Sequence, residues 1–271
     1  MADVPPRPNG RGAAQAIHRL MDEESPMDIS GAVVLVTGAS SGIGAATARA
    51  ASRDGARVVL LARREERIRQ LAKELGESVA LAVPCDVTDR VQVAAAVEAA
   101  IEKFGRIDVL VNNAGQGLQA SVDAIDPEDF RAVLELNLVA PLTATQAVLP
   151  QMRKQGAGAI VNVGSGIIWS SLPGSGAYSA SKAALAKLSA VARVELADDN
   201  IAVSMMFPSI TETEFVRTVR GDVAGALKME GSSGLAPQSP EGAADTILDL
   251  IRSGAEQADL VPEEYGGTLK S

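Results

Sequence analysis

Tyr178 and Lys182 are the two residues of this sequence whose types and spacing best suit proton transfer. They are four residues apart in a stretch, Ala177–Ala197, with helical spacing, so their side chains are expected to share one helix face. A free phenol has a pKa of about 10, and a neighbouring ammonium group stabilises its phenolate. Such a tyrosine can donate a proton to a carbonyl oxygen or accept one from an alcohol. A tyrosine and a lysine at this spacing are more often structural when nothing else supports them.

A second candidate site is the glycine-rich turn at residues 37–44, which reads TGASSGIG. It connects a predicted strand, Val33–Thr37, to a predicted helix, Ile43–Asp54. Small residues let the backbone turn tightly and approach a pyrophosphate, and the helix N-terminus offers free N–H groups. The spacing is G-x-x-x-G-x-G rather than the general G-x-G-x-x-G fingerprint, and glycines alone often mark only a turn. The position between the first strand and the first helix favours a dinucleotide site.

The end of the second predicted strand indicates which nicotinamide cofactor would bind. An acidic residue about 20 positions after the glycines would bind a ribose 2′-hydroxyl and select NAD, but Arg63 and Arg64 stand there instead. A guanidinium matches a 2′-phosphate by charge-assisted hydrogen bonds. From Arg49 to Arg69, seven arginines face three acids, a local charge of +4 in a chain of −9. The sequence therefore favours NADP(H) over NAD(H), with Arg63 as the main contact and Arg64 sharing it. Four of the other arginines, Arg49, Arg53, Arg67 and Arg69, fit solvated helix faces paired with acids.

Short β-branched runs alternate with longer alanine-rich segments of helical spacing. The predicted strands are Val33–Thr37, Arg57–Ala62, Val79–Pro84, Ile107–Asn112, Ile160–Gly164 and Ile201–Phe207. The clearest predicted helices are Ile43–Asp54, Arg90–Phe104 and Ala177–Ala197. Strands that are apolar on both faces and separated by helices indicate a parallel sheet covered on both sides. The predicted fold class is α/β, a doubly wound parallel sheet with helices on both faces in a single domain at 29–271.

Two segments depart from this alternation. Residues 1–28 carry several prolines and glycines and too few apolar residues for a core, which predicts a flexible N-terminal arm that contains His18, the sole histidine. Residues 213–240 are rich in glycine and longer than most connections in a compact domain. We expect a mobile substrate loop there; the alternative is a disordered insertion.

Composition excludes several classes of protein. The net charge of −9 argues against a partner that is a nucleic acid or an anionic membrane. One cysteine and one histidine exclude a disulfide framework and a histidine-rich metal site, so no metal is expected. The longest apolar runs are strand-sized, below the ~18 residues of a membrane span. We expect a soluble, cytoplasmic protein.

Further motifs follow the strands in order. Asp86 follows the third strand, and Asn112-Asn113-Ala114-Gly115 ends the fourth. Asn137 lies in the next helical segment, Ser165 follows the fifth strand, and residues 178–182 read YSASK. With the glycine-rich turn, this set resembles the short-chain dehydrogenase/reductase family over nearly all of residues 31–262. The resemblance implies a Rossmann-type sheet and hydride transfer between a nicotinamide cofactor and a carbonyl or alcohol.

The resemblance also assigns roles to residues. In the family, the catalytic positions correspond here to Asn137, Ser165, Tyr178 and Lys182: the asparagine holds a water linked to the lysine, and the serine binds the reacting oxygen. The implied cofactor contacts are Gly38, Ser40, Ser41, Ile43, Asp86, Val87, Asn113, Tyr178, Lys182 and Thr213, beside Arg63 and Arg64. Two departures stand out: Gly164 replaces a usual serine, which suggests a more mobile loop, and Ser209 replaces a glycine after the sixth strand.

The predicted function is an NADP-dependent oxidoreductase that interconverts a ketone or aldehyde and an alcohol, with Tyr178 as general acid/base. The alternative is a catalytically silent cofactor-binding sensor or regulatory protein on the same fold. Ile167, Ile168, Trp169 and Phe215 suggest an apolar pocket wall, together with Gln116, Gly117 and Leu118. The substrate is therefore expected to be a small, apolar carbonyl or alcohol compound. By analogy with the family, a homodimer or homotetramer is expected.

Overall fold

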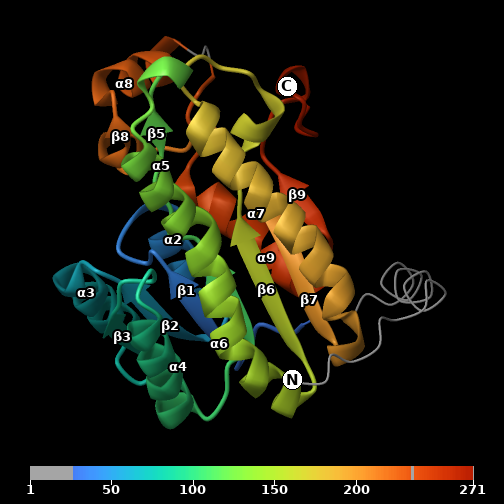
Figure 1. Cartoon of the computed structure of the whole chain (residues 1–271). Coiled ribbons are helices and arrows are strands. Elements are labelled where there is room, and N and C mark those ends of the chain that lie inside the picture. Colours follow the sequence, from blue (N-terminus) through green and yellow to red (C-terminus); the bar gives the residue numbers. More distant parts are fainter. Residues whose placement is uncertain (1–26, 233–234, 271) are drawn as a thin grey trace, which may run out of the picture.

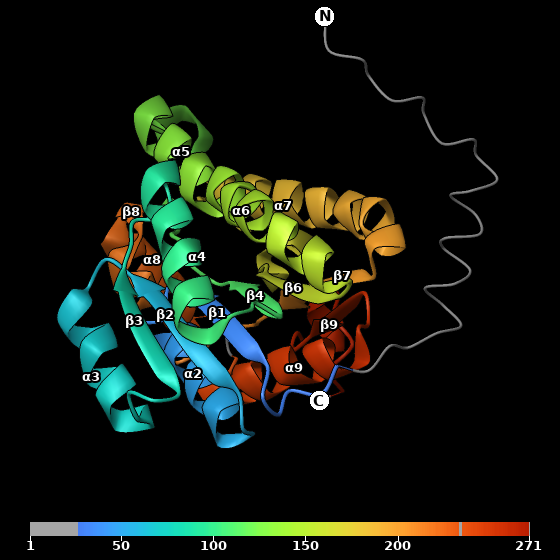
Figure 2. The ribbon, with the colours of Figure 1, turned by 90° about the horizontal axis from the view of Figure 1, so that it is seen from below.

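The computed structural model describes residues 27–232 and 235–270. The predicted N-terminal arm and its His18 fall almost wholly outside these residues. Met27 already belongs to the folded body, because its backbone N–H donates to the carbonyl of Arg252 (3.2 Å). From there the chain forms a parallel sheet between two layers of helices (Figures 1 and 2).

The sheet has seven strands, and every neighbouring pair is parallel. In spatial order they are β3 (Ala80–Pro84), β2 (Arg57–Ala62), β1 (Val33–Thr37), β4 (Val109–Asn112), β6 (Gly158–Val163), β7 (Ile201–Phe207) and β9 (Gln257–Asp259). The order reverses between β1 and β4, and a crevice at the carboxyl ends of such strands is where ligands bind in open α/β sheets. A separate two-stranded pair joins β5 (Leu118–Gln119) and β8 (Arg220–Gly221).

Helices cover both faces of the sheet (Figure 2). One layer consists of α2 (Gly42–Arg53), α3 (Glu65–Leu75) and α9 (Pro240–Ser253). The other consists of α4 (Arg90–Phe104), α5 (Pro127–Leu134), α6 (Ala140–Gln155) and α7 (Gly176–Glu195). Shorter helical segments are η1 (Val122–Ala124), η2 (Glu135–Val139), η3 (Gly166–Trp169), η4 (Ala197–Asp199), η5 (Phe215–Thr218), η6 (Glu263–Tyr265) and α8 (Val223–Ser232).

Strand β1 illustrates why the sheet is covered on both sides. All five of its residues are buried. Val34 and Val36 pack with apolar residues of α2 and α9, whereas Val33 and Leu35 pack with those of α4 and α6. Side chains alternate between the two faces of a strand, so a strand that is apolar throughout needs a helical layer on each face.

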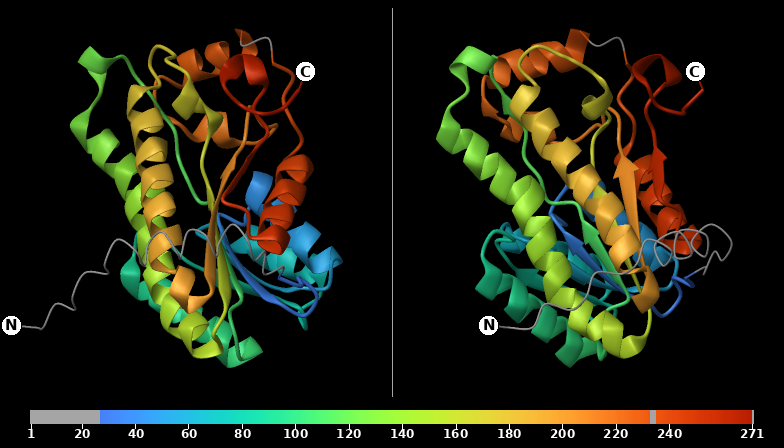
Figure 3. Two further views of the ribbon diagram at one scale, coloured as in Figure 1. Left: turned by 90° about the vertical axis from the view of Figure 1, so that its right-hand side faces the viewer. Right: turned by 45° about the vertical axis from the view of Figure 1, so that its right-hand side comes forward.

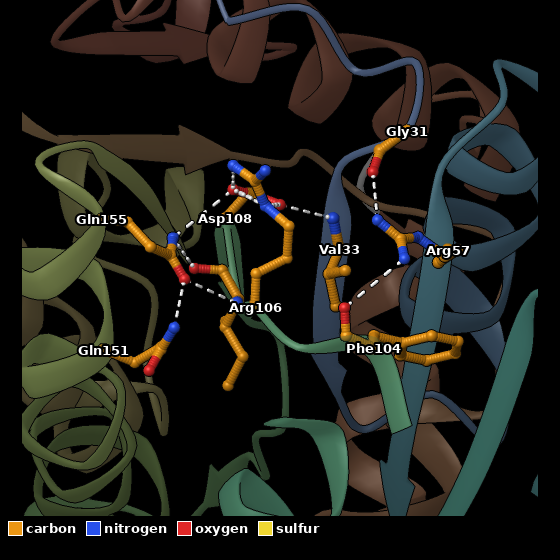
Figure 4. Close-up of polar contacts among 9 residues, drawn as sticks. Gly31, Val33, Arg57, Phe104, Arg106, Asp108, Gln151 and Gln155 are labelled. Carbon is orange, nitrogen blue, oxygen red and sulfur yellow. Dashed lines mark hydrogen bonds and ion pairs between the residues drawn. The ribbon is translucent and has the colours of Figure 1, made fainter. Parts of the chain in front are cut away.

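A buried carboxylate fixes the amino end of β1 against the neighbouring strand (Figure 4). Asp108 precedes β4, and its Oδ2 accepts a hydrogen bond from the backbone N–H of Val33 (2.8 Å). Arg106 compensates the charge, with Nη2 2.6 Å from Asp108 Oδ1. Beside them, Arg57 of β2 donates to the carbonyl of Gly31 (2.8 Å). These contacts hold the register of the central strands, whose carboxyl ends carry the site.

The structure confirms the predicted fold class, and each predicted strand and helix lies within two residues of its observed bounds. The sequence analysis missed strand β9. The described part of the predicted loop 213–240 forms η5, β8 and α8, and the mobility expected of it stays a prediction.

The helices α5, η2 and α6 run on as one stretch, Pro127–Gln155, of 29 residues, with mean hydropathy 1.4 over its most apolar window. By length and composition alone it could cross a membrane. However, Ala144, Val148 and Met152 of α6 pack into the core cluster beneath the sheet, as in the core helix of an α/β domain.

Candidate active site

Tyr178 and Lys182 lie one turn apart on α7, at the carboxyl edge of the sheet. Around this edge, the loop before α7, helix α8 and the C-terminal residues gather (Figures 1 and 3). Lys182 is only 4% exposed, and its Nζ donates to the carbonyl oxygen of Val163, the last residue of β6 (2.8 Å). Tyr178 is half-buried. The sequence spacing therefore brings the phenol and the ammonium group to one place beside the end of β6.

Burial shifts both ionisable groups toward their neutral forms. It raises the pKa of Tyr178 to about 12, opposed in part by a hydrogen bond with Ser165. It lowers the pKa of Lys182 to about 8. Desolvation disfavours a charge of either sign, which explains why the two shifts have opposite directions. In the protein alone the phenol of Tyr178 is thus protonated at neutral pH.

Ser165 completes the group around the phenol. It directly follows β6 and Gly164, and its Oγ accepts a hydrogen bond from the backbone N–H of Ile167 at the start of η3 (3.3 Å). The same side chain hydrogen-bonds the phenol of Tyr178. Two hydroxyl groups from different elements therefore meet at one point, where both can reach a single substrate oxygen.

Asn137 lies in η2, a π-helical turn between α5 and α6, and is fully buried. Its Oδ1 accepts from the backbone N–H of Gln116, and its Nδ2 donates to the carbonyl of Gln116 (both 2.9 Å) and to Ser181 Oγ (3.0 Å). Ser181 in turn donates to the carbonyl of Tyr178 (2.7 Å). Asn137 therefore ties the segment after β4 to helix α7. Its predicted role in a water relay stays a prediction.

The sequence analysis missed Ser181, although it lies inside the YSASK motif and is completely buried. A buried serine one residue before the lysine was the available signal. It also missed the carbonyl of Val163, which no sequence pattern marks as a partner for Lys182.

The glycine-rich turn fits a cofactor pyrophosphate. Gly38 has φ +68°, and a Cβ there would lie 2.8 Å from Asn113 Nδ2; a Cβ on Gly44 would lie 2.5 Å from the same atom. The Asn113 amide donates to the carbonyls of Thr37 (2.9 Å) and Gly38 (3.4 Å), which fastens the turn to the segment after β4. The side chain of Ser41, the N-cap of α2, does not cap the helix. The N–H groups of the first turn therefore stay open to an anion.

The structure distinguishes the two arginines after β2. Arg63 is exposed, and its guanidinium makes no hydrogen bond or ion pair within the described part of the chain. Arg64 reaches back to the glycine-rich turn, with Nε 3.0 Å from Ser40 Oγ and Nη2 2.5 Å from Ser41 Oγ. Its Nη1 pairs with Glu214 Oε2 (2.7 Å). Sequence analysis missed Glu214, because a contact across 150 residues leaves no local signal.

The remaining predicted cofactor residues lie near this edge with partners of their own. Asp86 Oδ1 accepts hydrogen bonds from the backbone and the hydroxyl of Thr88 (3.0 and 2.8 Å). Val87 is buried in the core cluster on the α4 face of the sheet, whereas Ile43 packs against the separate cluster on the α2 face. The methyl of Thr213 lies beside Gly42, where an added Cβ would be 2.9 Å away. Thr213 thus lies against the glycine-rich turn, and its role as a cofactor contact stays a prediction.

Both departures from the family pattern have a structural account. A Cβ on Gly164 would lie 2.8 Å from Phe207 Cδ1, so this glycine allows close packing against β7, a reason other than the mobility expected from the sequence. Ser209 needs no glycine conformation, since Asn200 is the one non-glycine residue with positive φ among those described.

Aromatic rings cover the reacting side of the site. The Phe215 ring lies 5.6 Å from that of Tyr178 and covers Gly117. The Trp169 ring packs on Phe207 at 4.9 Å. Leu118, predicted as a pocket wall, is instead buried in a small cluster with Val133 and Ala177.

Comparisons with known proteins agree with this arrangement. The family model described as short chain dehydrogenase matches residues 32–224. An uncharacterized oxidoreductase of Staphylococcus haemolyticus is 34% identical over 228 residues, covering 84% of this chain and 94% of that protein. A 3-oxoacyl-[acyl-carrier-protein] reductase of Thermotoga maritima is 40% identical over 189 residues, covering 69% and 77%.

Among solved structures, a 3-ketoacyl-(acyl-carrier-protein) reductase of Brucella melitensis complexed with NADH superposes with a TM-score of 0.76 at 30% identity, covering 85% of this chain and 98% of that one. A short-chain dehydrogenase/reductase of Burkholderia phymatum gives a TM-score of 0.82 at 24% identity, covering 89% and 92%, and so supports the fold. The Rossmann-type sheet with its glycine-rich turn and paired tyrosine and lysine defines a class of nucleotide-dependent oxidoreductases. This chain belongs to the short-chain dehydrogenase/reductase family and is an oxidoreductase of that family.

Proposed function

We propose that the protein is an NADP(H)-dependent oxidoreductase that interconverts a ketone or aldehyde and the corresponding alcohol. The observation that carries the proposal is the meeting of Ser165 and Tyr178 beside the buried ammonium group of Lys182. Hydroxyl donors in a partly dry site stabilise the charge that develops on a carbonyl oxygen.

Each side chain then has a distinct task. Bound NADPH supplies hydride to the carbonyl carbon. Tyr178 donates the phenolic proton to the carbonyl oxygen, and Ser165 hydrogen-bonds that oxygen. Lys182, held by the carbonyl of Val163, stabilises the phenolate that remains. Asn137 keeps the tyrosine-bearing helix aligned with the segment after β4.

The residues that would hold the cofactor line the carboxyl ends of β1, β2 and β4. The glycine-rich turn and the uncapped start of α2 would receive the pyrophosphate. Two exposed arginines at the end of β2 favour a 2′-phosphate over a bare hydroxyl, which supports NADP(H). The similar Brucella melitensis structure is a complex with NADH, so the choice of cofactor needs a direct test.

The test is oxidation of NADPH and of NADH by the purified protein with a panel of carbonyl compounds. Because two relatives are named as 3-oxoacyl-[acyl-carrier-protein] reductases, the panel includes 3-oxoacyl thioesters beside apolar ketones. We expect turnover that Tyr178→Phe abolishes. Cofactor binding without turnover of any carbonyl would favour the silent sensor instead.

The assembly we propose is a homodimer or homotetramer that works in the cytoplasm. Four apolar side chains in the helical layer of α6 and α7 are about 40% exposed: Val139 at the end of η2, Leu142 on α6, and Val191 and Val194 on α7. These helices run side by side over one face of the sheet (Figure 2). An apolar surface rimmed by polar residues is typical of a contact between subunits.

A further inference from the structure

The loop after β7 connects the two halves of the site. The methyl of Thr213 lies against Gly42 of the glycine-rich turn, and the Phe215 ring stands 5.6 Å from the ring of Tyr178. Farther along, the carbonyl of Thr218 accepts a hydrogen bond from Gln116 Nε2 (2.6 Å). Residues 213–219 therefore touch both the cofactor side and the catalytic side.

Glu214 is the residue of this loop that holds it to the cofactor side. Its Oε2 lies 2.7 Å from Arg64 Nη1 and 2.7 Å from Arg67 Nη1. Hydrogen bonds from Arg67 and Arg64 lower the pKa of the Glu214 carboxyl to about 2, so it is charged throughout the physiological range. One carboxylate oxygen thus pairs with two guanidinium groups, so the three side chains together keep a net positive charge.

The partners of Glu214 have the composition of a phosphate site. Arg64 also donates hydrogen bonds to the hydroxyl groups of Ser40 and Ser41 in the glycine-rich turn. We call Ser40, Ser41, Arg64 and Arg67 the arginine–serine cluster. Guanidinium and hydroxyl donors that converge in this way suit phosphate oxygens as well as a carboxylate.

There is room for a larger anion at the same place. A hollow of about 240 Å³ opens beside the cluster and is lined in part by Ser40 and Arg67. Arg49, which also lines it, is already held by Glu74 in a two-pronged ion pair (2.8 and 3.0 Å). Arg67 is therefore the arginine lining this hollow whose partner, Glu214, belongs to a loop rather than to a neighbouring helix.

We propose that Glu214 is a determinant of cofactor selectivity. In the free protein its carboxylate binds to the arginines of the arginine–serine cluster. When NADP(H) binds, its 2′-phosphate displaces the Glu214 carboxylate from the cluster. The inference rests on the cofactor named in the proposed function. The incoming phosphate and the carboxylate compete for the same guanidinium donors, whereas NAD(H) brings no group that displaces Glu214. Glu214 therefore weakens the binding of NADP(H) selectively and links the exchange of anions to the loop that carries Phe215.

The size of the effect follows from the exposure of the pairs. The side chains of Arg64, Arg67 and Glu214 are each a little under half exposed, and exposed ion pairs are modest in strength. Loss of two such pairs corresponds to roughly a threefold to tenfold change in affinity.

The experiment is calorimetric titration of the full-length protein with NADPH, NADH, adenosine 2′,5′-bisphosphate and 5′-AMP. The variant is Glu214→Gln, and the matched control is Glu212→Gln. Glu212 stands two positions earlier in the same loop, is exposed, and takes part in no ion pair among the residues described. Glu214→Gln is expected to raise the affinity for NADPH and for the bisphosphate about threefold to tenfold. The affinities for NADH and 5′-AMP should stay within about twofold of the wild-type values. Glu212→Gln is expected to change the affinity for none of the four ligands.

Hydrogen exchange provides a second measurement that needs no cofactor. In Glu214→Gln, the amides of residues 213–219 are expected to exchange at least about threefold faster than in the wild type or in Glu212→Gln. Equal exchange in all three proteins would mean that Glu214 does not hold the loop, and would overturn the inference.

The titrations separate failure of this inference from failure of the proposed function. A wild type that favours the bisphosphate over 5′-AMP, with no change in Glu214→Gln, refutes the role of Glu214 and leaves the NADP preference standing. If the wild type does not favour the bisphosphate over 5′-AMP and Glu214→Gln changes neither affinity, both the role of Glu214 and the NADP preference are refuted. Weaker NADPH binding in Glu214→Gln also overturns the inference, because it would make the carboxylate a support of the phosphate site rather than its competitor.

Discussion

The Nζ atom of Lys182 lies 2.8 Å from the carbonyl oxygen of Val163, so the buried ammonium group is anchored to the end of β6 as well as to its own helix. Ser165 follows Val163 by two residues and hydrogen-bonds the phenol of Tyr178. The lysine and the serine thus both contact, or directly follow, the end of β6. In the mechanism that we propose, Tyr178 is the proton donor and the other two residues support it.

Replacing Tyr178 by Phe is expected to lower kcat at least ~100-fold, the usual scale for a positioned acid or base. The ring remains to pack against Phe215, so the affinity for NADPH should be nearly unchanged. Steady-state kinetics and a binding titration measure the two effects separately. A variant that keeps more than about a third of the wild-type kcat would exclude Tyr178 from the chemistry.

Lys182 should make the stability of the protein depend on pH. Its pKa is about 8 in the folded protein, below the usual lysine value of 10.5. Between these values the unfolded chain keeps the proton that the folded protein has lost, so the free energy of unfolding rises with pH, by up to about 1.4 kcal/mol per unit. Below pH 8 the cost of burying the charge is present in full, and it disappears above the unfolded pKa.

The measurement for Lys182 is urea unfolding of the wild type and of Lys182→Met between pH 7 and 9.5, below the range in which Tyr178 titrates. From pH 8 to 9.5 the wild type should gain about 1–2 kcal/mol relative to the variant. Parallel pH profiles of the free energy of unfolding in the two proteins would mean that the pKa of Lys182 is not lowered in the folded protein. In the same variant, catalysis should fall, since neutral methionine cannot stabilise a phenolate.

Self-association is expected to depend on the exposed apolar residues of α6 and α7. The double substitution Leu142→Arg with Val191→Arg places two charges on this surface and should convert the assembly to monomers. Val91→Arg is the control, because Val91 is an equally apolar, more exposed residue (77%) on α4. Light scattering at micromolar concentration reports the assembly. A monomeric wild type would contradict the proposal.

The central fold was predictable because its causes are local. The strands β1 and β2 contain uninterrupted apolar runs, and the apolar run of β7 is broken only by Ser204; buried parallel strands require such runs. Strand β9, with the sequence Gln-Ala-Asp, has no such run; it is a strand because it pairs with β7 at the sheet edge. Its existence depends on tertiary contact, which periodicity does not record.

The candidate site likewise has features that local sequence predicts and features that depend on tertiary contact. Tyr178 and Lys182 could be paired from helical spacing alone, and the turn at residues 37–44 from its glycines. The contact of Glu214 with Arg64 joins residues 150 positions apart on loops whose path the sequence does not determine. For that reason the sequence analysis ranked Arg63 above Arg64, whereas the guanidinium that reaches the glycine-rich turn belongs to Arg64.

The last prediction compares these two arginines. The wild type is expected to prefer NADPH over NADH by at least tenfold in kcat/KM, about 1.4 kcal/mol. If Arg63 binds the 2′-phosphate, Arg63→Asp should invert the ratio of kcat/KM with NADPH to kcat/KM with NADH. The new carboxylate repels the phosphate and accepts a hydrogen bond from the ribose hydroxyl of NADH. Arg64→Asp should lower NADPH efficiency too, and it should also loosen the loop at Glu214, which Arg63→Asp leaves paired.

Kinetics with both cofactors, together with hydrogen exchange over residues 213–219, distinguishes the two variants. A change in the cofactor ratio without faster exchange assigns the phosphate contact to Arg63. A change in both assigns it to Arg64, the residue whose guanidinium already meets Ser40 and Ser41. High salt should reduce NADPH binding more than NADH binding in the wild type, since it screens an exposed ion pair. Equal efficiency with the two cofactors in the wild type would show that neither arginine selects a phosphate.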